Sequence, residues 1–252
     1  MTTMDAAVPY REVRAELLSP AELDSALGEF GLAYLPLGSL EFHGPHLPIG
    51  LDALNAHGVC VAAAQITGGI VLPPVYQGIG GEHSDYPWTM MMRSDTGIRD
   101  HVLQTLARLE TFGVRRAVLF TGHFAGEQLA MIDVIAEDWK EAAGRTLHVL
   151  ATGVNRCQSS PIPADHAGVF ETSVLHSLHP ELVHLDRLPS ASARPALDPD
   201  GNTMGPQRHD PAHPLWGIFG PDPRALDTSS SGLVLEALVA WLAATASDRR
   251  AT

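Results

Sequence analysis

Cysteine and basic residues are both scarce in this chain of 252 residues. Its two cysteines, Cys60 and Cys157, do not indicate a disulfide framework, and a cytoplasmic location is expected. The 16 Lys and Arg residues are outnumbered by 29 Asp and Glu residues, which gives a formal net charge of -13 at pH 7. This balance argues against a nucleic-acid partner and against binding to an anionic membrane surface.

Long apolar runs are also missing. None approaches the roughly 20 residues that span a bilayer, and the longest candidate, 233–246, is interrupted by Glu236 and predicts a terminal helix. The first seven residues lack a basic segment followed by an apolar core, so no secretory signal is expected. Hydrophobic residues make up 45% and charged residues 18%, which is typical of a folded chain. We expect a single domain over residues 1–252.

Predicted strands alternate with predicted helices along most of the chain. Short apolar runs predict strands at 32–37, 69–75, 117–121 and 147–151. Helical spacing and capping residues predict helices at about 19–28, 53–66, 94–113 and 127–143, with a further helix ending near 178. This alternation favours a parallel sheet covered on both faces. In such sheets functional residues gather in the loops that follow the carboxyl ends of the strands.

The loop after the first predicted strand contains a candidate metal site. Glu41 and His43 are two residues apart, so in an extended chain their side chains project to the same side. Two glycines and two prolines separate them from Asp52, and a loop of that composition can fold back to bring Asp52 to the same point. Carboxylate and imidazole ligands suit Zn, Mn, Fe or Ni, and a carboxylate can bridge two ions. The alternative is a surface loop whose polar side chains are solvated.

Two later loops carry further candidates. The loop at 122–126 follows a predicted strand and contains His123, which could instead cap the next helix. The glycine-rich loop at 78–89 has neither a Walker lysine nor the spacing of a dinucleotide fingerprint, so a nucleotide site is not expected. Its polar residues Glu82, His83 and Asp85 precede Trp88 and either contact substrate or are simply exposed.

Three motifs in this order resemble the creatininase (creatinine amidohydrolase) family. They are the run from Gly38 to Pro48 with Asp52, the triplet 121–123, and the segment His166-Ala-Gly-Val-Phe-Glu-Thr-Ser that ends at Ser173. The resemblance extends to 217–223. It implies a three-layer α/β/α sandwich with a mostly parallel central sheet, assembled as a homo-oligomer and often as a hexamer. It also implies a divalent-metal centre that hydrolyses an amide-type C–N bond.

The resemblance assigns roles to individual residues. Glu41 and His43 correspond to terminal ligands of different ions, Asp52 to the carboxylate that bridges the two ions, and His123 to the partner of Glu41. Two ions per chain are expected, with Zn, Mn or Fe as candidates. His166 corresponds to the family histidine beside the substrate. Its ordinary pKa near 6.5 suits it to give a proton to the leaving nitrogen.

The chain departs from the creatininases at two places. Ala125 stands where they carry a glutamate ligand two residues after the histidine, and Glu171 is the predicted replacement, both as ligand and as catalytic residue. Glu171 could also be a first-turn acid favoured by the helix dipole. Ala164 stands where a creatininase has tryptophan, so creatinine is not the expected substrate. The predicted substrate-binding residues are Trp88, Glu82, His83 and Asp165.

The expected function is therefore metal-dependent hydrolysis of a small-molecule amide. A metal-activated water would attack a cyclic amide, a lactam or a formamide. Two alternatives remain open. One is a peptidase-type member of the family that trims a precursor peptide, and the other is a metal-binding module without catalytic activity.

Overall fold

A four-stranded parallel sheet forms the centre of the computed structural model, which describes residues 11–81, 84–193 and 210–248. The strands are β1 (Leu32–Leu37), β2 (Ile70–Val71), β3 (Arg116–Thr121) and β4 (His148–Gly153), in the order β2-β1-β3-β4. β1 and β3 pair along their whole length, from Leu32 opposite Arg116 to Leu37 opposite Thr121. Because they end in register, the loops that follow them leave the sheet side by side.

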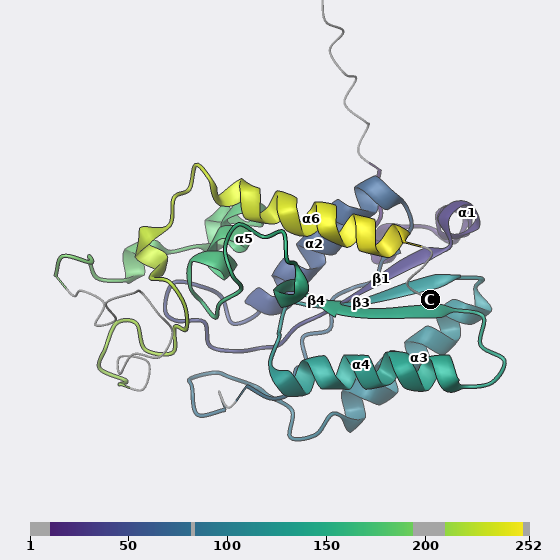
Figure 1. Cartoon of the computed structure of the whole chain (residues 1–252), viewed down its shortest axis with the longest axis horizontal. Coiled ribbons are helices and arrows are strands. Elements are labelled where there is room, and N and C mark those ends of the chain that lie inside the picture. The colour runs from purple at the N-terminus through teal and green to yellow at the C-terminus, as the bar shows by residue number, and fades with distance from the viewer. Residues whose placement is uncertain (1–10, 82–83, 194–209, 249–252) are drawn as a thin grey trace, which may run out of the picture.

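Helices cover both faces of the sheet (Figure 1). On one face lie α2 (Leu51–Thr67), α5 (Val169–Leu178) and α6 (Ser231–Ser247), and on the other lie α3 (Thr96–Thr111) and α4 (Gly126–Glu141). α1 (Pro20–Phe30) precedes β1, and short 3-10 helices occur at Ala15–Leu17, Val154–Arg156, Pro180–Leu182, Leu185–Arg187 and Pro223–Ala225. The predicted α/β/α sandwich is confirmed. None of the described helices is long and apolar enough to cross a membrane.

Side chains of β1 alternate between two apolar cores. Tyr34 packs with α2, α5 and α6, whereas Ala33 and Leu35 pack with α3 and α4. All six residues of β1 are buried, as expected for a parallel strand with both faces covered.

The second predicted strand is much shorter than the sequence indicated. Only Ile70–Val71 is strand, although the prediction covered 69–75. Pro73 and Pro74 have no N–H groups to donate to a neighbouring strand, so the ladder stops before them. Beyond them, Val75 makes an isolated bridge in which its N–H donates to the carbonyl of Pro36.

A third apolar cluster lies beyond the carboxyl edge of the sheet, where residues from the loop before α2 pack against α5 and against residues 215–218. The backbones of His166 and Phe219 exchange two hydrogen bonds of 2.7 Å there. The segment rich in proline and glycine at 189–223 therefore contacts the segment that carries His166 through its described part, while residues 194–209 lie outside the described part of the chain. The buried members of the cluster are Leu47, Leu51, Ala167, Leu175, Leu188, Leu215 and Ile218.

Two glycines let the first turn of α2 lie directly against the ends of β1 and β3. A Cβ on Gly38 would lie 2.2 Å from the backbone nitrogen of Ala53, and a Cβ on Gly122 would lie 2.1 Å from the carbonyl oxygen of Asp52. Neither clash is with a flexible side chain. This close approach places Asp52 at the edge of the sheet, next to the two loops.

We expect Gly122→Ala to destabilise the protein, because its new methyl group would push the start of α2 away from β3. Overpacking of this kind costs about 1–3 kcal/mol in the free energy of unfolding, measured by urea denaturation. Gly97→Ala is the matched control, since a Cβ on Gly97 in α3 meets nothing within 4 Å and alanine favours helices. Equal stability of Gly122→Ala and wild type would contradict the close packing around Asp52.

Candidate metal centre

Glu41, Asp52 and His123 converge beyond the carboxyl edge of the sheet. His123 Nδ1 lies 3.0 Å from Glu41 Oε2 and 3.3 Å from Asp52 Oδ2. The other ring nitrogen of His123, Nε2, lies 3.2 Å from the carbonyl oxygen of Ile79 and can donate its hydrogen there. That hydrogen bond directs Nδ1 at the two carboxylates, so that Nδ1 would offer its lone pair to a bound ion once its proton is displaced.

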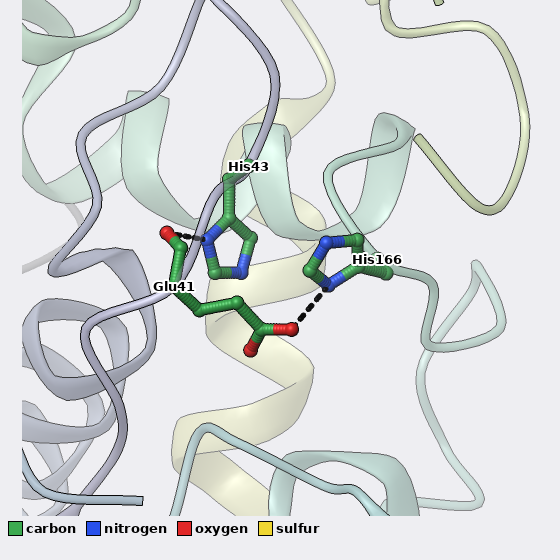
Figure 2. A group of neighbouring side chains, drawn as sticks. All are labelled: Glu41, His43 and His166. Carbon is green, nitrogen blue, oxygen red and sulfur yellow. Dashed lines mark hydrogen bonds and ion pairs between the residues drawn. The ribbon is translucent and has the colours of Figure 1, made fainter. Parts of the chain in front are cut away.

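His43, Asp52 and Glu171 form a second group. His43 Nε2 lies 3.2 Å from Asp52 Oδ1 and 3.5 Å from Glu171 Oε2. Its Nδ1 lies 2.9 Å from the carbonyl oxygen of Glu41, drawn as a dashed line in Figure 2. Despite its short distance to Asp52, the fully buried Nε2 makes no well-aligned hydrogen bond. A buried ring nitrogen that faces two buried carboxylates without a well-aligned hydrogen bond to either fits a cation between them.

Asp52 is shared between the two groups. Its Oδ1 faces His43 and its Oδ2 faces His123, which is the arrangement of a carboxylate that can bridge two ions. Within each group the potential ligand atoms lie within 4.8 Å of one another. The sequence predicted that a loop would carry Asp52 to the site, but Asp52 lies in the first turn of α2. The convergence was predicted, whereas the element that delivers Asp52 was not.

The buried charges of the metal-free cluster perturb its histidines. Burial lowers the pKa of His43, but the Asp52 and Glu171 carboxylates outweigh burial and raise this pKa to about 10. Burial lowers the pKa of His123 as well, but hydrogen bonds to Asp52 and Glu41 outweigh burial and raise this pKa to about 10. Burial also raises the pKa of Glu171 well above its ordinary value. At neutral pH the metal-free site therefore holds protons at positions that a cation would take.

Metal uptake should accordingly release protons, and affinity should increase with pH. Below the raised pKa values of His43 and His123, near 10, a divalent ion competes with bound protons. Each displaced proton makes the affinity rise by up to about tenfold per pH unit between about pH 6 and 9. Calorimetric titration with Zn²⁺ or Mn²⁺ in buffers of different ionisation enthalpy counts these protons. Binding without proton release would contradict the protonation described here.

His166 lies beside His43, with their ring centroids 4.4 Å apart, and its ring also faces the carboxylate of Glu41 (Figure 2). Its Nε2 lies 3.0 Å from the carbonyl oxygen of Phe42, and its Nδ1 lies 3.9 Å from Glu41 Oε1. The next residue, Ala167, is buried with a φ of 57°, an uncommon backbone conformation for a residue other than glycine. A cavity of about 130 Å³ lies against His166 and the candidate ligands. It is lined by Glu41, Asp52, Gly81, His123, Phe124, Ala125, His166 and Glu171.

Asp165 has a different position from the one predicted for a substrate-binding residue. It is 5% exposed and is not among the residues that line the cavity. Its carboxylate accepts hydrogen bonds from the backbone N–H groups of Gly168, Phe170 and Glu171, at 3.1, 2.9 and 3.2 Å. Asp165 therefore holds the first turn of α5, and through it the segment between His166 and Glu171.

Of the other predicted substrate contacts, only Trp88 lies in the described part of the chain. Trp88 is 80% exposed, has a φ of 61° and does not line the cavity. Glu82 and His83 lie outside the described residues, although their neighbour Gly81 does line the cavity. Asp85 is exposed. The sequence reasoning did not select Phe124, a cavity residue whose one signal was its place directly after His123.

Comparison with known proteins identifies a family model that matches almost the whole chain and relatives that align with about two thirds of it. The family model described as "Creatininase: Creatinine amidohydrolase" matches residues 16–246. A creatinine amidohydrolase of Pseudomonas putida is 29% identical over 176 residues, which cover 61% of this chain and 66% of the relative. A mycofactocin precursor peptide peptidase of Mycobacterium ulcerans is 34% identical over 173 residues, which cover 65% of each chain. The aligned regions thus span just under two thirds of these relatives' lengths.

Solved structures are similar to this chain over a larger part of its length. A creatinine amidohydrolase (creatininase) crystal structure has a TM-score of 0.72 at 26% identity, covering 94% of this chain and 97% of the other. A structure described as "Creatininase Mn" has a TM-score of 0.73 at 25% identity, covering 93% of this chain and 97% of the other.

Proposed function

The chain belongs to the creatininase family, and from this premise we propose that it is a divalent-metal-dependent amidohydrolase that cleaves a small, non-peptide amide C–N bond. The proposed substrate is a cyclic amide, a lactam or a formamide. Two ions, Zn, Mn or Fe, would be held by Glu41, His43, Asp52, His123 and Glu171.

The observation that carries this proposal is the buried Nε2 of His43, which lies 3.2 Å from Asp52 Oδ1 and 3.5 Å from Glu171 Oε2 without a well-aligned hydrogen bond to either. Two buried carboxylates beside a ring nitrogen supply the donor set of a transition-metal ion. Asp52 extends that set to the Glu41 and His123 side.

Different residues would bind the ions, orient the histidine ligands and transfer a proton. A bound divalent ion polarises a carbonyl and lowers the pKa of a water ligand. The backbone carbonyls of Glu41 and Ile79 accept hydrogen bonds from the rings of His43 and His123, which aims the other nitrogen of each ring at the centre. His166 can donate from Nε2 to Phe42, so its Nδ1 is the atom that would take a proton and return it to the leaving nitrogen.

The size of the cavity supports a small substrate. About 130 Å³ accommodates only a few atoms beyond the proposed ions, whereas pockets for drug-sized ligands reach about 300–1,000 Å³. Ala164, in place of the tryptophan of creatininases, offers no ring on which creatinine could stack. The second candidate is cleavage of a precursor peptide, which the 34% identity to the mycobacterial peptidase favours.

Turnover by the metal-loaded protein tests the proposal. Protein reconstituted with Zn²⁺ or Mn²⁺ is assayed against cyclic ureas, lactams, formamides and short peptides, with chelator-treated protein as the control. We expect metal-dependent release of amine or acid from a non-peptide amide. Hydrolysis restricted to peptides would favour the second candidate. Tight metal binding without any turnover would favour a module without catalytic activity.

Glu171 is proposed to replace the glutamate that creatininases have at the position of Ala125. Glu171→Gln should therefore lower metal content from two ions per chain to one, because the amide removes a charged ligand from the His43 side. Adding Ala125→Glu should restore the second ion, since Ala125 lines the same cavity. Plasma mass spectrometry of dialysed protein measures both. Two ions retained by Glu171→Gln would rule out this role.

A homo-oligomer, often a hexamer, remains part of the proposal through the family resemblance. Large exposed apolar side chains, on the loop after β2 and at the end of α3, support an interface between copies: Trp88, Met90, Met92 and Phe112. Light scattering on the purified protein measures the assembly.

A further inference from the structure

Ser39 lies at the point where two of the candidate ligands meet. It is the second residue after β1 and is completely buried. Its Oγ lies 2.6 Å from Asp52 Oδ2 and 3.2 Å from Glu41 Oε2. These are the two oxygens that face His123 Nδ1. One hydroxyl group therefore touches both carboxylates of the first ligand group.

The Ser39 hydroxyl can donate only one hydrogen bond. A serine has one O–H donor, and the short contact directs it to Asp52 Oδ2. With Oδ2 held in this way, Oδ1 is left on the His43 side, 3.2 Å from Nε2. The contact therefore fixes the rotation of the Asp52 carboxylate about its bond to the side chain. That rotation decides whether each oxygen faces a different ion.

The imidazole ligands are oriented differently. His43 and His123 are aimed by backbone carbonyls, those of Glu41 and Ile79. Carbonyls cannot orient a carboxylate, because both are hydrogen-bond acceptors, so an acidic ligand needs a donor. Ser39 supplies this donor. Its Cβ also packs tightly, since a Cβ on Gly78 would come within 2.6 Å of it.

We propose that Ser39 is a positioning residue of the metal centre, which holds Asp52 in its bridging orientation. This inference rests on the proposed metal centre and deepens it. Without the hydroxyl, the buried Asp52 carboxylate loses its donor and can rotate. Outer partners of metal ligands typically change affinity by about 10–100-fold.

Titration with Co²⁺, followed by its visible absorption, tests the role of Ser39. We expect the Ser39→Ala variant to bind Co²⁺ about 10–100-fold more weakly than wild type at the more strongly affected of the two sites. Its absorption band should also change, because the Asp52 ligand is reoriented. Ser173→Ala is the matched control. Ser173 is also buried, and its hydroxyl donates to the carbonyl of Val169 at 2.6 Å without touching a candidate ligand. Its Co²⁺ affinity and spectrum should equal those of wild type.

The outcomes separate this inference from the proposed function. Normal Co²⁺ binding by wild type, together with an unchanged affinity and spectrum in Ser39→Ala, would overturn the role of Ser39 alone. Equal weakening in Ser39→Ala and Ser173→Ala would also overturn it, because any buried hydroxyl would then suffice. Absence of Co²⁺ binding by wild type would overturn the metal centre itself, and the role of Ser39 with it.

Discussion

Replacing His123 by alanine should remove metal and activity together. His123 supplies the ring nitrogen that lies 3.0 Å from Glu41 and 3.3 Å from Asp52, so its loss leaves two buried carboxylates without a neutral ligand between them. We expect the ion on that side to be lost during dialysis and kcat/KM to fall at least about 10³-fold, since the ion supplies both the nucleophile and carbonyl polarisation.

Metal analysis and hydrolysis rates measured on the same preparation test this prediction. His101→Ala is the control, because His101 is an exposed histidine on α3 and belongs to neither ligand group. It should retain both ions and full activity. Full activity of His123→Ala after verified loss of metal would refute metal-dependent hydrolysis.

Replacing His166 by alanine should reduce turnover but leave the metal in place. Its Nδ1 faces the cavity while Nε2 is engaged with the carbonyl of Phe42, so it is placed to move a proton rather than to hold the fold. Loss of such a general acid or base lowers kcat by about 10²–10⁴-fold. The measurement is kcat on protein whose two ions have been verified.

The alternative role of His166 gives a different result. Glu41, His43 and His166 also form a group with metal-ligand spacing, in which His166 Nδ1 lies 3.9 Å from Glu41. If His166 were a ligand, His166→Ala would lose an ion along with its activity. Added imidazole provides a second readout, because it can restore proton transfer in the cavity left by the ring. Rescue with unchanged metal content is the result expected for a proton-transfer residue.

The sequence was most informative where pattern and topology agree. Short apolar runs alternating with helices predicted parallel strands, and parallel strands that end in register bring their following loops together. Glu41 and His43 after β1, and His123 after β3, were therefore expected to meet, and they do. Glu171 was chosen because Ala125 stands where creatininases have a glutamate, and its Oε2 lies 3.5 Å from His43 Nε2, while its role as a ligand stays a prediction.

Other positions depended on contacts that a linear pattern does not encode. Asp165 has the chemistry of a substrate contact, but its carboxylate satisfies three amide groups of α5. Trp88 follows a proline in a loop whose direction is set by long-range contacts, and its side chain points to solvent. Ser39 lies in the first family motif, the run from Gly38 to Pro48, but the sequence suggested no function for it. Its position two residues before Glu41 places both side chains on one side of an extended chain.

Asp52 shows why local backbone fit mattered more than loop composition. Proline and glycine before it suggested a loop that folds back, but the helix already begins at Leu51. What brings Asp52 into the site is the absence of side chains on Gly38 and Gly122, which lets α2 touch the sheet edge. The sequence shows these glycines, but only the packed structure shows that the first turn of α2 needs their space.

Anomalous X-ray diffraction from crystals soaked in Zn²⁺ or Mn²⁺ tests the central claim most directly. Two peaks are expected for each chain, one among Glu41, Asp52 and His123 and the other among His43, Asp52 and Glu171. Asp52 should contact both. Crystals of hydrolytically active protein without an anomalous peak at either group would contradict the account.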